Sequence, residues 1–311
     1  MSLMREYGGM RRAMLTSAAV LVVWAGVACG SDRQPSPAQE GEGRDGAVTV
    51  ASFAFSESRV LAEIYAQVLE KEGLTVRRAF QLASREVVEP ALEQGKVDLV
   101  PEYVGTALRF LQPRQQPDDA YAALRQAFAA RGVTVLAPAP AENKNGIVVT
   151  RATARRLRLT KVSDLAPVAK DLVFGGPPEC PERPLCLPGL RSTYGLTFKQ
   201  FRALDAGGPA TVAALEGGEV DVGLLFTTDG HLTEGDFVLL ADDKGLQPAE
   251  NVVPVVRTEV ARAHGPALAV LDRVSAQLHN EDLIALNRRV EIDRVTPARA
   301  ASDWLRQQGF L

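Results

Sequence analysis

The sequence has few cysteines and histidines, two residue types on which catalysis and metal binding often depend. It contains three cysteines and three histidines in 311 residues, and His231, His264 and His279 are scattered along the chain. It has no G-x-S-x-G, no H-E-x-x-H and no glycine-rich phosphate-binding loop, the motifs typical of serine hydrolases, zinc peptidases and nucleotide-dependent enzymes. We therefore expect a protein that is not an enzyme and that carries neither a metal ion nor a cofactor.

The chain also lacks an excess of charge of either sign. Its 35 basic and 38 acidic residues are well mixed and give a net charge of −3. The one basic run, RATARRLRLTK at 151–161, has no interleaved aromatic residues. Such a run is typical of a solvated helix face rather than of a nucleic-acid contact. We expect no nucleic-acid partner.

Long hydrophobic runs are absent except near the start of the sequence. Three arginines precede an apolar run from Ala13 to Ala28, which has the length of a signal-peptide core and is too short to span a bilayer comfortably. The run ends in GVAC, with small residues before Cys29 as in a bacterial lipobox, although Gly26 stands where leucine is usual. We expect residues 1–29 to be a lipoprotein signal peptide, with Cys29 lipidated and the protein anchored outside the cytoplasm by lipid alone. An ordinary secretory signal that happens to contain a cysteine is the alternative.

The next segment, 30–46, reads GSDRQPSPAQEGEGRDG and has no apolar residue except Ala38 and the prolines. A segment of this composition buries too little surface to order itself, so we expect a flexible tether. The roughly 265 residues that follow are enough for two lobes with real cores.

The two remaining cysteines, Cys180 and Cys186, enclose the segment PERPL. Paired cysteines in an exported protein usually form a disulfide. The rival interpretation is a metal site, but two thiols without a neighbouring histidine are too few ligands. The spacing therefore predicts a disulfide.

One phrase occurs twice in the sequence. Residues 91–100 read ALEQGKVDLV and residues 214–223 read ALEGGEVDVG. Each phrase ends a predicted helix at a glycine and continues through Val-Asp into a β-strand. The segments that lead into the phrases, from Phe80 and from Phe201, are also similar. A repeated helix–turn–strand unit predicts two similar α/β lobes with a ligand-binding cleft between them.

Strand-like and helix-like segments alternate through both halves. VTVASFAF (48–55) precedes a segment with apolar residues at helical spacing, and DLVFGGPP (171–178) is its counterpart in the second half. This alternation predicts an α/β fold in which each lobe is a mostly parallel sheet flanked by helices. The stretch NVVPVVR (251–257) is expected to return to the first lobe.

The loops at the carboxyl ends of these strands should face the cleft, because ligands bind there in open parallel sheets. Helix N-termini in such loops favour carboxylates and other anions, so the cleft suits a small solute with an acidic end. Ser56, Ser84 and Ser163 could instead serve only as helix N-cap residues without contacting a ligand. The loops are Ser52–Glu57, Leu82–Arg85, Pro101–Thr106, Asn143–Gly146 and Thr227–Gly230.

The order of the motifs FAFSES, ALEQGKVDLVPEYVGTAL, SDLA, TYGL, FTTDG and LADDKG resembles the glycine betaine/choline family of ABC-importer substrate-binding proteins. The resemblance covers roughly residues 47–311. It implies a two-lobed periplasmic-binding-protein fold of type II, with residues 47–143 plus 251–311 as lobe 1 and 144–250 as lobe 2. It also implies a monomer that closes over a small zwitterionic or cationic solute and delivers it to a permease driven by a separate ATPase subunit.

The family usually holds quaternary ammonium ligands in an aromatic cage, and the resemblance carries this cage over only in part. Tyr103 in PEYVGT matches the family, whereas Val100, Asn145 and Glu250 stand where relatives have tyrosine. We therefore expect a ligand with more hydrogen-bonding groups than betaine, or a larger one with an aromatic ring or a cationic head near Glu250. Betaine fits if other aromatic residues rebuild the cage, and the candidates are Phe53, Phe55, Tyr194 and Phe226. Each of these could instead belong to the core.

Two other functions stay open at this point. A sensor would bind solute without passing it to a permease, and an enzyme would use carboxylates such as Glu102 and Asp229 in the cleft. The ligand-binding residues predicted from the loops and the resemblance are Ser52, Phe53, Ser56, Ser84, Arg85, Glu102, Tyr103, Thr106, Asn143, Asn145, Thr227, Thr228, Asp229 and Glu250.

Overall fold

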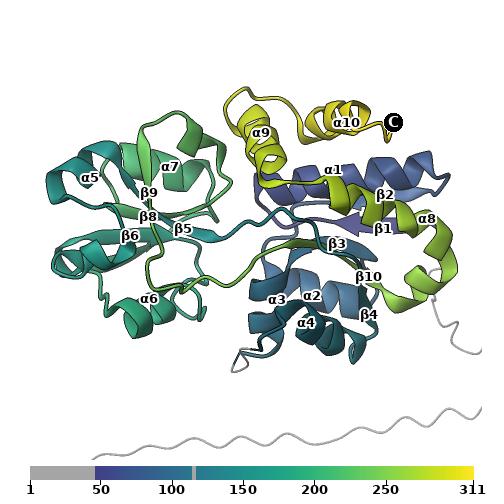
Figure 1. The fold of residues 1–311 in the computed structure, drawn as a ribbon, viewed down its shortest axis with the longest axis horizontal. Helices are drawn as coiled ribbons and strands as arrows, with labels where there is room; N and C mark the ends of the chain where they lie inside the picture. Colours follow the sequence, from purple (N-terminus) through teal and green to yellow (C-terminus); the bar gives the residue numbers. More distant parts are fainter. Residues whose placement is uncertain (1–45, 114–116) are drawn as a thin grey trace, which may run out of the picture. The chain divides into compact units, whose positions relative to one another are not determined.

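A computed structural model describes residues 46–113 and 117–311 (Figure 1). The predicted signal peptide, the lipidation site Cys29 and all but the last residue of the predicted tether lie outside the described residues. The described part of the chain contains two five-stranded sheets, each flanked by helices. We call the elements around the first sheet the first lobe and those around the second sheet the second lobe.

The first sheet has the strand order β2-β1-β3-β10-β4. Strands β1, β2 and β3 are parallel, whereas β10 runs antiparallel to both of its neighbours. In chain order the strands are β1 (Val48–Ala51), β2 (Val76–Ala79), β3 (Leu99–Tyr103), β4 (Val133–Val135) and β10 (Val252–Arg257).

Helices cover both faces of the first sheet. Figure 1 shows α1, α8, α9 and α10 on one face and α2, α3 and α4 on the other. Helix α1 turns its regularly spaced apolar side chains, among them Leu61, Ile64 and Tyr65, into the core. The helices are α1 (Ser56–Lys71), α2 (Arg85–Glu93), α3 (Val104–Leu111), α4 (Ala120–Ala129), α8 (Thr258–Gln277), α9 (Asn280–Glu291) and α10 (Pro297–Gln307).

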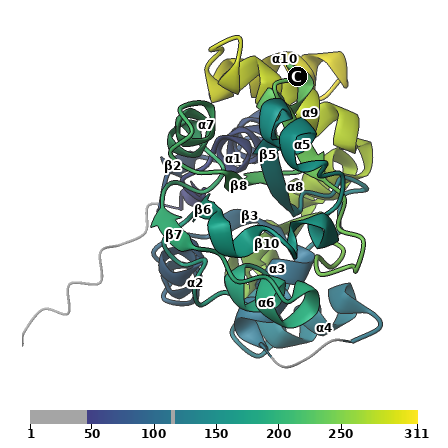
Figure 2. The same cartoon turned by 90° about the vertical axis from the view of Figure 1, so that its left-hand side faces the viewer.

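The second sheet has the strand order β7-β6-β8-β5-β9, and here β5 is the antiparallel strand. Figure 2, which looks onto the left-hand side of Figure 1, shows α6 and α7 on opposite sides of this sheet, and Ala154 of α5 packs in the same hydrophobic cluster as Leu190 of α6. The elements are β5 (Asn145–Thr150), α5 (Arg151–Leu157), η1 (Val162–Leu165), η2 (Ala169–Asp171), β6 (Val173–Gly176), α6 (Leu187–Tyr194), β7 (Gln200–Ala203), α7 (Pro209–Glu216), β8 (Val222–Phe226), η3 (Gly230–Thr233) and β9 (Phe237–Leu240).

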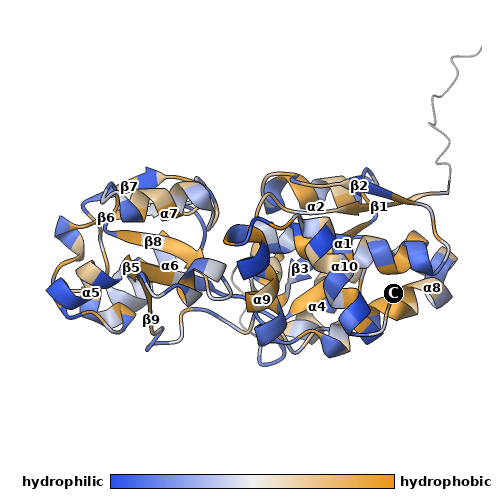
Figure 3. Ribbon diagram, turned by 90° about the horizontal axis from the view of Figure 1, so that it is seen from above, coloured by the Kyte–Doolittle hydropathy of each residue, from blue (hydrophilic) through white to orange (hydrophobic). Residues whose placement is uncertain are grey.

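The second sheet is buried on both faces because alternate residues of its central strands point in opposite directions. Ile147 and Val149 of β5 belong to one hydrophobic cluster, and Val148 between them belongs to another. Figure 3 accordingly shows hydrophobic residues along β8 and hydrophilic residues on the outer helix α5.

The two sheets have the same topology. In each, the antiparallel strand is the one that the chain enters directly after crossing from the other lobe: β5 follows the crossing near Asn143, and β10 follows the crossing near Glu250. The predicted fold class, two lobes each built on a mostly parallel sheet flanked by helices, is confirmed.

The structure explains why Val-Asp occurs in both copies of the repeated phrase. The Asp98 carboxylate accepts a hydrogen bond of 2.9 Å from the backbone N–H of Thr49 at the start of β1. In the second lobe, Asp221 accepts one of 3.0 Å from Val173 at the start of β6. Each aspartate thus satisfies a backbone donor that would otherwise lack a partner at the start of a buried strand.

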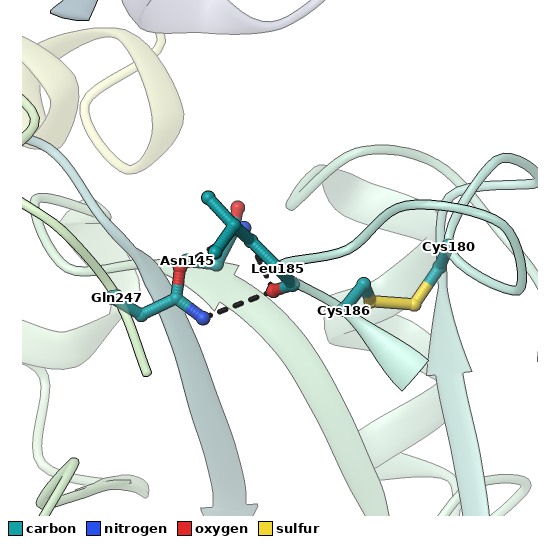
Figure 4. Close-up of a disulfide and its surroundings, with 5 residues drawn as sticks. All are labelled: Asn145, Cys180, Leu185, Cys186 and Gln247. Atoms are coloured by element: carbon teal, nitrogen blue, oxygen red, sulfur yellow. Dashed lines mark hydrogen bonds between the residues drawn. A yellow bond between two sulfur atoms is a disulfide. The ribbon is translucent and has the colours of Figure 1, made fainter. Parts of the chain in front are cut away.

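The predicted disulfide between Cys180 and Cys186 is confirmed, with 5.2 Å between the two Cα atoms. Figure 4 shows the loop that it closes next to β5. The backbone oxygen of Leu185 in this loop accepts hydrogen bonds from Gln247 Nε2 at 3.0 Å and from Asn145 Nδ2 at 3.4 Å. The loop is therefore fixed both by the disulfide and by the two segments beside it. Within the described residues, no helix is both long and apolar enough to cross a membrane.

Candidate functional site

A cavity of about 980 Å³ is lined by loops and helix ends from both lobes. The first lobe contributes the β1–α1 loop, the turn before α2 and the first turn of α3. The second lobe contributes the disulfide loop, the turn before α7 and the end of β8. These are the carboxyl ends of parallel strands, where the topology predicts a binding site.

Four aromatic rings form one connected cluster in the cavity wall. The ring centroid of Phe55 lies 5.9 Å from that of Phe53, 6.0 Å from that of Tyr103 and 4.8 Å from that of Phe226. All four residues line the cavity. Tyr194, the other aromatic residue considered as a possible cage member, is not in the wall and donates a hydrogen bond to Asp242 instead.

The repeat could have identified Phe226. Tyr103 stands three residues after the end of the first repeated phrase, and Phe226 stands three residues after the end of the second. They end the equivalent strands β3 and β8. Each lobe therefore offers one ring from the same position of its sheet, and Phe55 lies within contact distance of both.

Arg85 reaches the cavity with its charge neutralised by a carboxylate behind it. Its guanidinium pairs with Glu102 through Nε–Oε1 and Nη2–Oε2 distances of 2.7 and 2.8 Å, and it also donates to Thr106 Oγ1 at 3.1 Å. Burial opposes the charged guanidinium, but the Glu102 carboxylate outweighs burial, and the pKa of Arg85 is raised. The planar fork is thereby held in one orientation 5.4 Å from the ring centre of Phe53.

Glu250 lies beneath the first turn of α3. Its Oε2 accepts hydrogen bonds from the backbone N–H of Gly105 at 3.1 Å and from Thr106 Oγ1 at 3.3 Å, and its Oε1 is buried without a partner. Burial raises the pKa of Glu250 to about 8. The approach requires glycine, because a Cβ on Gly105 would come within 2.7 Å of the backbone oxygen of Ala249 and 2.9 Å of Glu250 Oε1.

A further buried carboxyl group, Glu89 of α2, lies behind this part of the wall. Both of its oxygens are buried without a hydrogen-bond partner. Burial, reinforced by the neighbouring negative charge of Glu102, raises the pKa of Glu89 well above the usual range. Glu89 is therefore most stable in its protonated form.

Glu57, in the first turn of α1, is a buried carboxylate with four hydrogen-bond donors. Its Oε1 accepts from Tyr103 Oη and Asn143 Nδ2, each at 2.7 Å. Its Oε2 accepts from Thr228 Oγ1 at 2.5 Å and from Asn287 Nδ2 at 2.7 Å. The pKa of the Tyr103 hydroxyl is raised by burial and by the Glu57 charge, so the hydroxyl remains a donor at neutral pH.

Asp229, His231 and Glu291 form a polar cluster where η3 of the second lobe meets α9 of the first. Asp229 Oδ1 accepts from the backbone N–H and from the ring Nδ1 of His231, and Glu291 Oε2 accepts from the Gly230 N–H at 2.8 Å. The hydrogen bond to Asp229 raises the pKa of His231, and burial raises that of Glu291 to about 8. These side chains bring one ligand-type atom each within 4.8 Å of one another, but their hydrogen bonds account for the arrangement and we assign no metal to it.

Charged residues of opposite sign line the cavity from the two lobes. The first lobe contributes mainly arginines, and the second mainly carboxylates; His231 and Arg183 of the second lobe and Glu291 of the first are exceptions. Such a wall suits a solute that carries both charges. The arginines are Arg59, Arg85, Arg109 and Arg294, and the carboxylates are Glu179, Asp205, Glu216, Glu234 and Asp236.

The disulfide loop contributes a segment of wall that also pairs with the opposite lobe. Arg183 Nη2 lies 2.8 and 3.1 Å from the two carboxylate oxygens of Glu86 on α2. Both side chains are partly exposed, at 34 % and 43 %. The pair connects the lobes at the edge of the cavity, but water screens it.

The structure places the predicted ligand-binding residues in two groups. Eight of them line the cavity: Phe53, Ser56, Ser84, Arg85, Tyr103, Thr106, Asn143 and Asn145. Six are not part of its lining: Ser52, Glu102, Thr227, Thr228, Asp229 and Glu250. Whether any of the fourteen contacts the solute stays a prediction.

Five of the six residues outside the lining hydrogen-bond directly to a residue of the wall, and Thr228 is joined to Tyr103 of the wall through Glu57. Ser52 Oγ also accepts from the backbone N–H of Gln81 and fixes the loop before α2. Thr227 Oγ1 accepts from the Lys144 N–H in the crossing segment. Wall residues that the loops did not predict include Arg59, Arg183 and His231, and the turn 205–209 before α7.

Comparison with known proteins matches the chain to a glycine betaine transport family and to two glycine betaine-binding proteins. A family model described as the substrate binding domain of an ABC-type glycine betaine transport system matches residues 46–307. A glycine-betaine-binding protein of Pseudomonas aeruginosa is 34 % identical over 276 residues, which are 84 % of this chain and 88 % of the relative. The glycine betaine-binding protein YehZ of Escherichia coli is 29 % identical over 85 % of this chain and 91 % of its own length.

Among solved structures, one of a glycine betaine/carnitine/choline ABC transporter aligns with a TM-score of 0.67. The alignment covers 85 % of this chain and 99 % of the other, at 24 % identity. At this identity the likeness shows the fold alone. The predicted two-lobed periplasmic-binding-protein fold of type II is confirmed.

Proposed function

Because the chain belongs to the family of substrate-binding domains of ABC-type glycine betaine transport systems, we propose that it captures a small quaternary ammonium solute in the cavity between its lobes. It then delivers the solute to a permease driven by an ATPase subunit. The observation that carries the proposal is the aromatic wall made of Phe55 and the three rings around it, to which both lobes contribute.

A quaternary ammonium ion has no N–H to donate, so a binding site must attract it through its charge and its apolar surface. The faces of aromatic rings do both, and each cation–π contact contributes about 0.5–2 kcal/mol. Phe55 and Phe226 supply aromatic surface although Val100, Asn145 and Glu250 replace three tyrosines of the family. A carboxylate at the other end of the solute fits the arginine-bearing side of the wall. The solute class that follows is a zwitterion such as glycine betaine, or choline.

The test compares each solute with the isostere in which a carbon atom replaces the ammonium nitrogen. Calorimetric titration with glycine betaine and with tert-butylacetate isolates the contribution of the cation, because the two molecules differ only in nitrogen against carbon. Choline and 3,3-dimethylbutanol form a second pair. We expect the ammonium-bearing member of at least one pair to bind more tightly than its carbon isostere. Equal affinity within both pairs, or no binding of any member, would count against the proposal.

A variant of the wall completes this test. Phe55→Leu should weaken binding of the charged solute by about 2- to 30-fold, as expected for the loss of one cation–π contact. The matched control is Phe198→Leu, since Phe198 packs on Phe174 in the second lobe and does not line the cavity. It should leave the affinity unchanged.

We also infer that the chain binds without catalysing a reaction. The two carboxylates considered for catalysis are already engaged outside the cavity lining: Glu102 pairs with Arg85, and Asp229 accepts from His231. Neither is free to transfer a proton to a solute at the rings. Recovery of the solute unchanged after long incubation, measured by mass spectrometry, is the expected result.

The location and assembly of the protein complete the proposal. Lipidation at Cys29 would hold a monomer on the outer face of the cell membrane by its acyl chains, next to its permease. Incorporation of a labelled fatty acid into the native chain, and its loss in the Cys29→Ala variant, is the expected outcome. Labelling that survives this substitution would contradict the assignment of Cys29.

A further inference from the structure

The carboxylate of Glu57 joins four segments that are far apart in the sequence. Its four donors come from the end of β3, the crossing segment before β5, the segment after β8 and helix α9. No side chain in this group is more than 5 % exposed. We call this group the Glu57 hub: Glu57, Tyr103, Asn143, Thr228 and Asn287.

A buried carboxylate in this position needs its donors. Removing such a charge from water is costly unless hydrogen bonds replace those of water. Each oxygen of Glu57 accepts two bonds of 2.5–2.7 Å, so all four donors contribute to holding the charge. Withdrawing the donors of one lobe would leave the carboxylate under-bonded, and this makes the four contacts interdependent.

The hub connects the cavity wall with the region where the chain crosses between lobes. Tyr103 and Asn143 line the cavity, and the Tyr103 ring belongs to the aromatic cluster. Thr228 lies in the second lobe, directly after Thr227, whose hydroxyl accepts from the backbone of Lys144 in the crossing segment. Asn287 of α9 donates both to Glu57 and to the backbone oxygen of Thr228. Glu57 itself is not part of the cavity lining.

We propose that Glu57 is a positioning residue that couples solute contact at Tyr103 to the placement of the second lobe at Thr228. The proposal rests on the proposed function, because the coupling matters only if a solute binds beside Tyr103. Tyr103 and Thr228 bond to different oxygens of one carboxylate. The Glu57 carboxylate therefore links the two hydroxyls through direct hydrogen bonds.

A double-mutant cycle measures this coupling. Tyr103→Phe and Thr228→Val each remove one hydroxyl and keep the shape of the side chain, and the affinity for glycine betaine is measured for both single variants and for the double variant. We expect the effect of the double variant to differ from the product of the single effects by about threefold or more. In a Glu57→Gln background the same cycle should become multiplicative. Effects that are already multiplicative with Glu57 present would overturn the proposal.

Two controls separate coupling from general loss of stability. Thr228→Ser restores the hydroxyl and should recover most of the affinity lost in Thr228→Val. Glu63→Gln alters another buried glutamate of α1, which pairs with Arg78 and Gln67 within the first lobe, and it should leave the cycle non-multiplicative. If Glu63→Gln abolishes the non-multiplicativity as Glu57→Gln does, the effect belongs to α1 as a whole and the assignment to Glu57 fails.

A readout without solute keeps this proposal distinct from the proposed function. Spin labels on Lys96→Cys and Lys170→Cys, in a Cys29→Ser background, report the distance between an exposed site on each lobe. We expect Glu57→Gln to broaden the distance distribution and Glu63→Gln to preserve it. If no solute binds the native chain, the proposed function fails, and the labels still decide the role of Glu57. An unchanged distribution in Glu57→Gln would refute that role.

Discussion

Replacing Glu250 with glutamine should flatten the dependence of stability on pH. Glu250 Oε1 is buried without a partner, and burial raises the pKa of this group from 4.5 to about 8. Between these two values the folded chain holds a proton that the unfolded chain has released. Stability therefore falls as pH rises through this window, because the folded state binds the additional proton.

The magnitude follows from the width of the window. One proton difference changes the free energy of unfolding by about 1.4 kcal/mol per pH unit. From pH 4.5 to about 8 this gives a decrease of roughly 4–5 kcal/mol in the native chain. Glutamine has no charge at any of these pH values. The free energy of unfolding of Glu250→Gln should therefore decrease less over this pH range. The difference in stability between the variant and the native chain should change in favour of the variant as pH rises.

The assay is urea unfolding at pH 5, 6, 7, 8 and 9 for both proteins. Glu89 and Glu291 also have raised pKa values, so the quantity to compare is the difference between variant and native chain rather than either curve alone. Glu93→Gln serves as the control for removing one glutamate, because Glu93 is partly exposed and pairs with Arg131. Parallel curves for the native chain and Glu250→Gln would refute the reasoning.

Three further predictions concern the first turn of α3 and the disulfide loop. Gly105→Ala should lower the free energy of unfolding by about 1–3 kcal/mol, because its Cβ would meet the Ala249 oxygen at 2.7 Å; the control Gly265→Ala, which meets nothing within 4 Å, should not destabilise the chain in urea. Changing both Cys180 and Cys186 to serine should reduce thermal stability by roughly 2 kcal/mol, as expected for a short loop, and should weaken solute binding because the loop lines the cavity; unchanged affinity would show that the wall does not depend on the bond. Arg183→Ala should weaken solute binding by less than about fivefold, and the effect should shrink in high salt because the pair with Glu86 is partly exposed; a large, salt-independent loss would contradict this.

Much of the fold could be predicted because local patterns determine it. The repeated phrase predicted two equivalent helix–turn–strand units. Its aspartates accept hydrogen bonds from backbone N–H groups at the starts of β1 and β6. Periodic apolar residues such as Leu61 and Ile64 marked the buried face of α1. The repeat and the helical spacing can be seen directly in the sequence, whereas the hydrogen bonds of the two aspartates span 49 and 48 residues and became visible only in the structure.

The site was less predictable because the loops that surround a cavity do not reveal which side chains point into it. Glu102 and Tyr103 are neighbours in the phrase PEYVGT, yet successive side chains of a strand point to opposite faces. Tyr103 lines the cavity, and Glu102 lies behind the wall, where it pairs with the lining residue Arg85. Alternation alone could have separated these two. The contacts of Glu57 with Thr228 and Asn287 depend instead on packing between distant segments, for which the sequence has no local signal.

Three buried glutamates, of which Glu102 and Glu250 were predicted to contact the solute, are better placed to orient the wall of the cavity. Three residues of the wall that can recognise a ligand each contact a buried glutamate: Tyr103 contacts Glu57, Arg85 contacts Glu102, and Thr106 contacts Glu250. A side chain fixed in this way loses little conformational freedom when a ligand binds, which lowers the entropic cost of binding. In the proposed binding mode the solute contacts the rings and the arginine, and the glutamates would act on affinity through the orientation of the wall. In this binding mode the acidic residues behind the cavity hold the wall in position, and the aromatic faces bind the cation of the solute.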